Sequence, residues 1–409
     1  MTSAARSKSL NIVLGVSGGI AAYKVASILR LLTEAGHNVQ VVPTQAALNF
    51  VGSATWEALS GNPLISEVWD DVADVPHVRI GKAADLVLVA PSTADLLSRA
   101  ANGAANDLLT NVLLTATCPI FFAPSMHTEM WLNAATQENV ATLRSRGSIV
   151  IDPADGRLTG SDSGPGRLPE AEEIVSVALG VLSEQDLLGQ EVVITAGGTR
   201  EPIDAVRVIA NRSTGKQGYA IASEAVSRGA KVTLISTADL PTPFGVNLVQ
   251  VETAQQMMEA VNAEAKSADV VVMAAAVADV RPVQAAMHKL KKDPLTGLIC
   301  NLGAIELEAT PDILAGLGKC KPAGQVLVGF AAETENLVAN AQSKLERKGA
   351  DLIVANDVSQ AGVGFAHATN AVTLVARGTE PVEVALADKR SIARSIVNAV
   401  VAIRSARTN

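Results

Sequence analysis

The sequence predicts an α/β protein made of two doubly wound, Rossmann-like domains. Its 409 residues exceed the size of one ordinary core. Apolar strand-like runs alternate with helix-like segments along the chain, which is typical of parallel sheets covered on both faces. Residues 10–43 and 191–236 also repeat one strand–turn–helix–strand unit. We place the boundary near residues 183–190, with domains at 1–186 and 187–409.

The first repeat begins with the strand "LNIVLGV" and the glycine turn "SGGI". The helix "AAYKVASILRLLTEAG" and the strand "HNVQVVP" follow. Gly36 is placed to end the helix, because glycine readily adopts the left-handed conformation found after a helix C-terminus. The later strands predicted in this half are "ADLVLVAP", "CPIFFAP" and "SIVID", with helices between them.

The second repeat begins with the strand "EVVITA" and a long loop, residues 197–215. The helix "KQGYAIASEAVSRG" then ends at Gly229, and the strand "AKVTLIS" follows. The later strands predicted in this half are "NLVQVE", "ADVVVMAA", "QVLVGFAAE", "ADLIVAN" and "AVTLVAR". Ligands of such folds bind at the carboxyl ends of the strands, so candidate sites are sought there.

Composition excludes several classes of function. The net charge of −8 disfavours nucleic acid and anionic membranes as partners, and 3% aromatic residues are too few for base stacking. Cys118, Cys300 and Cys320 form no CxxC pair, which fits a reducing compartment. The N-terminal apolar run is short and broken by glycines, and no run is long enough to span a membrane. We therefore expect a soluble, cytoplasmic protein.

Two strand ends in the first half carry small and hydroxyl-bearing residues. Ser17, Gly18 and Gly19 can present backbone N–H groups to a phosphate, but a plain tight turn is an equally good interpretation. Ser92 and Thr93 offer hydroxyls at a helix start, where capping alone would explain them.

His77 precedes a predicted strand, and a lone histidine is more often structural than catalytic. The first half contains the segments "GVSGGIAAYK", "PHVRIGKAADLVLVAPSTADLL", "NGAANDLLT", "PSMHTEMW" and "SGPGRLPE". Taken together, these five segments resemble the flavin-dependent cysteine decarboxylases, specifically phosphopantothenoylcysteine decarboxylase, over about residues 10–175. The resemblance implies a flavodoxin-like flavoprotein domain with a catalytic His77. It implies FMN binding by Ser17, Gly18, Gly19, Thr44, Ser92 and Thr93.

The resemblance also implies a reaction. The cysteinyl group of the substrate is oxidised by flavin to a thioaldehyde, the carboxylate leaves as CO2, and a hydride from reduced flavin and a proton from an acid complete the product. Two positions depart from the family pattern. His127 stands where the family has Asn, and the family's catalytic Cys falls on or near Gly160. His127 and Asp162 are our candidates for the missing proton donor.

The second half carries a polar, basic loop at residues 197–215, and long loops in compact domains tend to be functional. We interpret it as an anion-binding loop. Residues 273–282 end an apolar strand in small side chains, which would let a ligand approach the backbone, with Asp279 placed for a divalent ion or a sugar hydroxyl. Lys289, Lys291 and Lys292 form a lysine run that we assign to phosphate binding rather than to a solvated face.

The segments "TAGGTREPIDAVRVIANRSTGKQGYAIA", "AAAVADVRP", "KLKK", "ATPDIL", "GFAAET" and "ADLIVANDVS" resemble phosphopantothenate–cysteine ligase, over about residues 191–360. The resemblance implies that CTP with Mg2+ activates the phosphopantothenate carboxylate as an acyl-cytidylate, from which the cysteine amine displaces CMP. It assigns Arg207 and Asn211 to the acyl intermediate and Lys289 to the transferring phosphate. The residues implied for CTP are Ala275, Asp279, Lys289, Thr310, Pro311, Asp312, Ile313, Phe330, Lys344 and Lys348, with Asp279 also the metal candidate.

The two resemblances support each other, since the product of one family is the substrate of the other. We therefore predict a bifunctional ligase and decarboxylase of coenzyme A biosynthesis. The resemblance implies a homo-oligomer with a trimeric decarboxylase core and a dimeric ligase. The alternative is an active ligase whose degenerate flavin domain serves as a scaffold or regulatory binder. A pair of nicotinamide-dependent reductase domains is disfavoured, because no GxGxxG motif follows either first strand.

Overall fold

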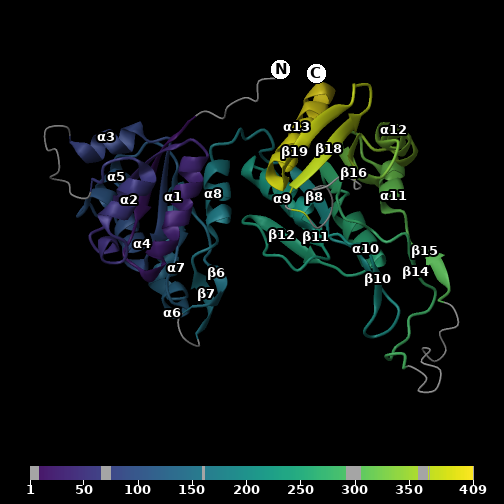
Figure 1. The fold of residues 1–409 in the computed structure, drawn as a ribbon, viewed down its shortest axis with the longest axis horizontal. Helices are drawn as coiled ribbons and strands as arrows, with labels where there is room; N and C mark the ends of the chain where they lie inside the picture. Colours follow the sequence, from purple (N-terminus) through teal and green to yellow (C-terminus); the bar gives the residue numbers. More distant parts are fainter. Residues whose placement is uncertain are drawn as a thin grey trace. The chain divides into compact units, whose positions relative to one another are not determined.

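The computed structural model describes residues 9–65, 75–158, 162–291, 305–357, 367 and 369–408. The chain divides into two compact units, residues 1–182 and 183–409. Each unit has its own sheet (Figure 1). Three positions discussed above, Gly160, Lys292 and Cys300, lie outside the described residues.

The first unit contains a five-stranded parallel sheet in the order β2-β1-β3-β4-β5, the order of flavodoxin-like folds. The central strand β3 is buried along its whole length, as expected where helices cover both faces. The strands are β1 (Asn11–Val16), β2 (Asn38–Pro43), β3 (Leu86–Ser92), β4 (Ile120–Pro124) and β5 (Ile149–Val150); a separate antiparallel hairpin consists of β6 (Ala154–Arg157) and β7 (Ser163–Arg167).

Short helices connect these strands. In the helical layers α1 packs against α8, while α3 packs on α5 and α4 on α7. The helices are η1 (Ile20–Lys24), α1 (Val25–Glu34), η2 (Ala47–Asn49), α2 (Ser53–Ser60), α3 (Pro76–Ala83), α4 (Ala94–Ala101), α5 (Leu108–Thr115), α6 (Thr128–Trp131), α7 (Ala134–Ser145) and α8 (Ala171–Gly180).

The second unit contains an eight-stranded sheet in the order β12-β11-β8-β13-β16-β17-β18-β19. The first six strands of this order pair in parallel, and β18 pairs antiparallel with both β17 and β19. The strands are β8 (Glu191–Ala196), β11 (Lys231–Ser236), β12 (Val246–Gln250), β13 (Val270–Met273), β16 (Val326–Glu333), β17 (Leu352–Asp357), β18 (Thr369–Ala376) and β19 (Val382–Asp388). Two small hairpins lie outside this sheet: β9 (Arg200–Pro202) with β10 (Val208–Ala210), and β14 (Val280–Pro282) with β15 (Leu307–Ala309).

Helices cover both faces of this sheet (Figure 1). Alternate residues of β13 show the two-sided core: Val270 and Val272 pack in the cluster with α9 and α13, and Val271 and Met273 pack in the cluster with α10, α11 and α12. The helices are α9 (Lys216–Ser227), α10 (Ala254–Glu264), α11 (Ile313–Cys320), α12 (Leu337–Lys348) and α13 (Lys389–Thr408).

The α/β fold with two largely parallel sheets is confirmed, and three local features differ from the prediction. Residues 197–215 are not a plain loop, because they contain the β9–β10 hairpin. The sheet of the second unit is not wholly parallel: only residues 377–381 join β18 to β19, too few for a crossover helix, so this pair is antiparallel. The first helix begins as the 3-10 helix η1. Within the described ranges, no helix is both long and apolar enough to span a membrane.

Candidate active sites

In the first unit, two turns meet where the sheet order reverses between β1 and β3. The buried Ser17 joins them: its Oγ donates a hydrogen bond to Pro91 O at 2.7 Å and accepts one from Thr93 N at 3.0 Å. Thr93 Oγ1 accepts from Leu96 N at 3.3 Å, so the capping interpretation holds for this residue. Ser92 Oγ is fully buried and has no hydrogen-bond partner among the described residues.

The glycine turn presents unused donors. Within the described part of the chain, the N–H groups of Gly18 and Gly19 have no backbone acceptor. Gly18 packs against the segment after β2, where an added Cβ would come within 2.9 Å of the carbonyl carbon of Ala46. Thr44 is buried and holds this segment, because its N–H donates to Val16 O at 2.9 Å and its Oγ1 accepts from Ala47 N. Thr44 therefore shapes the turn rather than lining the cavity beside it.

A cavity of about 760 Å³ opens beside these turns. This volume is in the range of cofactor and small-molecule sites. Its cationic side chains are those of Lys24, Arg157 and Arg167, and within the described ranges no acidic residue lines it. The other lining residues are Gly18, Gly19, Ile20, Ala21, Tyr23, Pro91, Thr93, Ser125, Met126, His127, Met130, Leu158, Gly166 and Leu168. Such a lining suits a planar, partly apolar and anionic ligand.

The β6–β7 hairpin lies against the "PSMH" segment at the mouth of this cavity. Met126 N donates to Gly166 O at 2.9 Å, and a Cβ at Gly166 would clash with the carbonyl oxygen of Met126. His127 lines the cavity, and its Nδ1 lies 4.0 Å from Oδ2 of Asp162, which follows the hairpin turn. The two residues that the sequence offered as separate proton donors therefore lie side by side.

His77 does not line this cavity. It lies at the start of α3, where its carbonyl oxygen accepts a hydrogen bond from Thr115 Oγ1 at 2.8 Å, and its buried Nδ1 has no partner within the part of the chain that the structure describes. Figure 1 shows α3 at the opposite end of the first unit from α6, β6 and β7. A single copy of the chain therefore does not bring His77 and His127 together.

In the second unit, the sheet order reverses between β8 and β13, and the segment after β13 is held there by hydroxyl groups. Thr195 Oγ1 accepts from Ala275 N at 3.1 Å, and Thr199 Oγ1 accepts from Ala278 N at 2.9 Å. Asn211 Nδ2 donates to Val277 O at 3.2 Å. Asn211 thus lies against the turn that carries Ala275 and Asp279.

A cluster of charged residues forms beside this turn. Thr310 N donates to Asp279 O at 3.0 Å, and Asp312 forms an ion pair with Lys348. Burial and then the charge of Lys348 lower the pKa of Lys344, whereas the charges of Glu333 and Asp279 act in the opposite direction. Five residues that the resemblance assigned to one nucleotide are therefore neighbours in space.

The side chain of Ile313 is an exception, since it is buried in the core under α11 and only its backbone can face a ligand. For the metal, the described residues contain no group of three or more His, Cys, Asp or Glu that could hold an ion. Asp279 would thus be a single protein ligand, as is common for Mg2+ bound mostly through phosphates and water.

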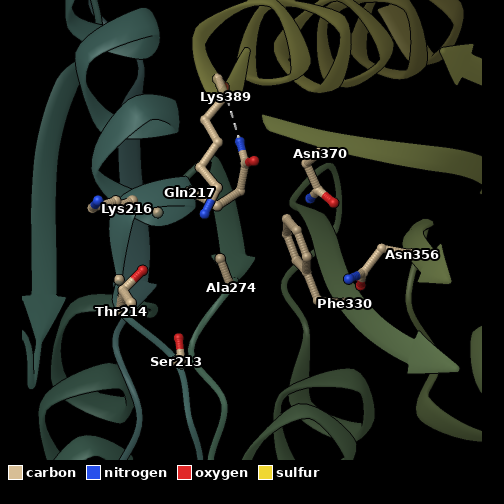
Figure 2. Close-up of a pocket in the computed structure, with 11 residues that line it drawn as sticks. Ser213, Thr214, Lys216, Gln217, Ala274, Phe330, Asn356, Asn370 and Lys389 are labelled. Atoms are coloured by element: carbon tan, nitrogen blue, oxygen red, sulfur yellow. Dashed lines mark hydrogen bonds between the residues drawn. The ribbon is translucent and has the colours of Figure 1, made fainter. Parts of the chain in front are cut away.

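A separate polar pocket lies at the carboxyl end of β13, and it is lined by residues from the start of α9, from β16 and from the start of α13 (Figure 2). Gln217 Nε2 donates to Lys389 O at 3.1 Å, and burial followed by the charge of Lys216 lowers the pKa of Lys389. The lining residues are Ser213, Thr214, Gly215, Lys216, Gln217, Gly218, Ala274, Phe330, Asn356, Asn370 and Lys389. Phe330 was expected here, but Asn370 and Lys389 were missed, because no local motif links them to a loop more than 150 residues earlier.

Arg207 and Lys289 do not line this pocket. Arg207 lies in the turn between β9 and β10 and donates from Nη2 to Leu290 O at 3.0 Å. Lys289 is exposed and precedes Leu290 in the chain. The structure therefore brings these two predicted residues close to each other.

Two family models match the chain. One described as "Flavoprotein" matches residues 1–183, and one described as "DNA/pantothenate metabolism flavoprotein C-terminal domain" matches residues 187–403. A Mycobacterium tuberculosis protein named "Coenzyme A biosynthesis bifunctional protein CoaBC" is 52% identical over 406 residues, covering 95% of this chain and 96% of its own length. A protein of the same name from Mycolicibacterium smegmatis is 54% identical over 385 residues, covering 90% of this chain and 92% of its own. A solved "C-terminal Domain of Coenzyme A biosynthesis bifunctional protein CoaBC" is 42% identical and covers 54% of this chain and 98% of its own, with a TM-score of 0.46.

Proposed function

Since the chain belongs to the CoaBC family of bifunctional coenzyme A biosynthesis proteins, we propose which residues carry each of its two activities. The enzyme performs the phosphopantothenoylcysteine synthetase and decarboxylase steps on small-molecule substrates. We assign the decarboxylase to residues 1–186, with FMN as its flavin, and the CTP-dependent ligase to residues 187–409. A cytoplasmic location stays a prediction from the sequence.

The cavity of the first unit fits FMN on three observations. The free N–H groups of Gly18 and Gly19 suit a phosphate. The volume of about 760 Å³ accommodates a cofactor together with a substrate arm. The orphaned Oγ of Ser92 offers a buried hydroxyl beside the turn. When bound, FMN would supply the oxidation and the returning hydride, and the side chains of the cavity would orient the substrate and move protons.

His127 is the proposed proton donor, and its place at the cavity beside Asp162 is the observation that carries this assignment. The carboxylate of Asp162 lies 4.0 Å from Nδ1 and can orient the imidazole ring, so that a ring N–H can give a proton to the product carbon. Both side chains are at least half exposed, so protons can be replenished from water. The pair would replace the cysteine that the family carries near position 160.

In the second unit, CTP is proposed to bind at the carboxyl ends of the strands, in the pocket of Figure 2 and at the charged cluster of Asp279, Asp312, Lys344 and Lys348. The lysines Lys216, Lys344 and Lys389 supply positive charge for the phosphates. Asp279 would hold Mg2+ through one carboxylate, and Asn211, which lies against the same turn, would contact the acyl group.

His77 reaches a decarboxylase cavity only if another copy of the chain supplies it, since it does not line the cavity of its own copy. This supports the expected homo-oligomer of the decarboxylase. The dimer expected for the ligase rests on the family resemblance.

The test is product identification by mass spectrometry after incubating the protein with phosphopantothenate, cysteine, CTP and Mg2+. The wild-type enzyme should form phosphopantetheine. His127→Leu should slow its formation by about 100-fold or more, the usual share of a general acid, and release unreduced enethiol. His37→Leu, a matched change at a half-buried histidine outside the cavity, should leave the products unchanged.

Each failure has a distinct meaning. Phosphopantetheine formed at the wild-type rate by His127→Leu would remove His127 as the donor. Condensation that proceeds without CTP would contradict the nucleotide assignment. A wild-type enzyme that stops at phosphopantothenoylcysteine would favour the scaffold alternative for the first unit.

A further inference from the structure

Asp204 is a buried carboxylate to which nothing so far assigns a role. It lies in the turn between β9 and β10, three residues before Arg207, and its side chain is fully buried. Its Oδ1 accepts the backbone N–H groups of Val206 and Arg207, both at 2.8 Å. Aspartates often close turns in this way, so these two bonds indicate only a local structural role.

The second carboxylate oxygen reaches a distant segment. Asp204 Oδ2 accepts the backbone N–H of Leu290 at 3.2 Å and lies 3.7 Å from Arg207 Nη1. Arg207 Nη2 in turn donates to Leu290 O at 3.0 Å. Both backbone groups of Leu290 are therefore held by the β9–β10 turn. Ala286 N also donates to Ile203 O at 3.0 Å, so the whole segment follows the hairpin.

Leu290 matters because Lys289 and Lys291 flank it in the chain. A lysine side chain is long and flexible, so its reach is set by where its backbone is fixed. Arg207 depends on the same carboxylate through its own N–H and its guanidinium group. One buried anion thus fixes cations from two segments that are more than 80 residues apart in sequence.

We infer that Asp204 is a positioning residue of the ligase reaction, which holds Arg207 and the lysines beside Leu290 in one arrangement so that they act on the same phosphate and acyl group. This inference rests on the proposed roles of Arg207 and Lys289. Stabilisation of a developing charge depends on donors fixed before the reaction, so a loosened arrangement costs rate even when the fold survives.

The charge of Asp204 supports this role. Burial on its own would raise the pKa of Asp204, but the N–H groups of Val206, Arg207 and Leu290 and the charge of Arg207 outweigh burial and lower it. The carboxylate is therefore ionised at neutral pH, with both oxygens available as acceptors.

Asp204→Asn should break the hydrogen bond to Leu290 and keep the hydrogen bonds within the turn. The amide oxygen can still accept from Val206 and Arg207, whereas the amide nitrogen that replaces Oδ2 cannot accept from Leu290 and faces a cation. Asp269→Asn is the matched control in the same unit. Its carboxylate also accepts a distant backbone N–H, that of Glu191 at 2.9 Å, and lies 3.6 Å from Arg404, but it lies at the amino end of β13, away from the carboxyl ends of the strands.

The assay measures acyl-cytidylate formation by pyrophosphate release and gives kcat and KM for phosphopantothenate and for CTP. For Asp204→Asn we expect kcat/KM for phosphopantothenate to fall by about 10- to 100-fold, with little change in KM for CTP. Decarboxylation of supplied phosphopantothenoylcysteine should not change. Asp269→Asn should lower only the Tm. Leu290→Pro, which removes the bridging N–H and leaves Asp204 intact, should reproduce the kinetic loss.

Wild-type kinetics for Asp204→Asn, or an equal kinetic loss in Asp269→Asn, would overturn the inference and leave Asp204 a structural residue. If Asp204→Asn does not fold, wild-type kinetics for Leu290→Pro would overturn the inference equally well. An absence of CTP-dependent pyrophosphate release in the wild-type enzyme would instead overturn the proposed nucleotide chemistry, before any variant is compared.

Discussion

Substituting Gly18 by alanine tests whether the first glycine turn holds the flavin phosphate. The added methyl group would lie within 2.9 Å of the carbonyl carbon of Ala46, and closer still to its Cβ. Neither the turn of Gly18 nor the segment of Ala46 can easily move. Ser17 fixes the turn through Pro91 and Thr93, and Thr44 fixes the opposing segment through Val16 and Ala47. The strain must therefore displace the turn and its N–H groups from the cavity.

Overpacking of this kind costs about 1–3 kcal/mol. If the cost falls on the turn, the affinity for FMN should drop by about 5- to 150-fold. The assay is fluorescence titration of the flavin-free protein with FMN, together with the flavin content after purification. Gly52→Ala is the control, because Gly52 has an ordinary φ of −69° and nothing within 4 Å of an added Cβ. Ligase turnover should stay normal in both variants.

The result that would refute this reasoning is a folded Gly18→Ala protein with wild-type FMN affinity. It would mean that the turn is only a tight turn, which the sequence left as an equal interpretation. A similar loss in Gly52→Ala would show that the first unit tolerates no change at its glycines, and the effect at Gly18 would then carry no information about the phosphate.

Two further predictions concern charge in the second unit. Lys344→Met should weaken CTP binding by about 10-fold, measured by calorimetric titration. The same substitution should raise the free energy of unfolding in urea at pH 7. The pKa of Lys344 is lowered in the folded protein, so its positive charge destabilises the folded state at pH 7. This penalty disappears only as the pH rises from the lowered pKa to the ordinary pKa of lysine. Asp351→Asn should lower the free energy of unfolding by about 3–5 kcal/mol, because it leaves Lys321 and Arg407 beside an uncharged group. For a unit of this size, the Tm should fall by about 6–20 °C. The pKa of Asp351 is lowered by Lys321, Leu327 N and Arg407 against the opposing effect of burial, so the advantage of the wild type should begin to shrink as the pH falls below about 4 and should be lost as the pH falls through the lowered pKa. A Tm that is equal for both proteins at pH 7 would contradict this ion cluster.

The sequence predicted the central strands well because they are buried on both faces and read as continuous apolar runs, as β3 shows. The edge strand β19 escaped prediction for the opposite reason. Val382 and Leu386 are exposed, so burial gave no signal, and the strand exists only because β18 supplies hydrogen-bonding partners. The β9–β10 hairpin was missed because its three-residue strands are too short to show periodicity.

The candidate sites were predictable to the extent that a residue lies beside a glycine or small-residue turn. Gly18, Asn211 and Asp279 all lie in such turns, and the structure places each at a strand end. Lys389 and Asp204 were not predictable in this way. The first begins a helix far along the chain, and the second has the spacing of an ordinary turn aspartate, whose bridge to Leu290 no local pattern reveals.

The sequence by itself determined the order of strands, helices and glycine turns in both units, and it determined which family the motifs resemble. Only the tertiary structure decided which turns share a cavity, because that depends on the order of strands in a sheet, which long-range pairing sets. It brought His127 to Asp162, Arg207 to Leu290 and Lys389 to Lys216. It also kept His77 away from the cavity of its own copy, because α3 lies at the other end of its unit.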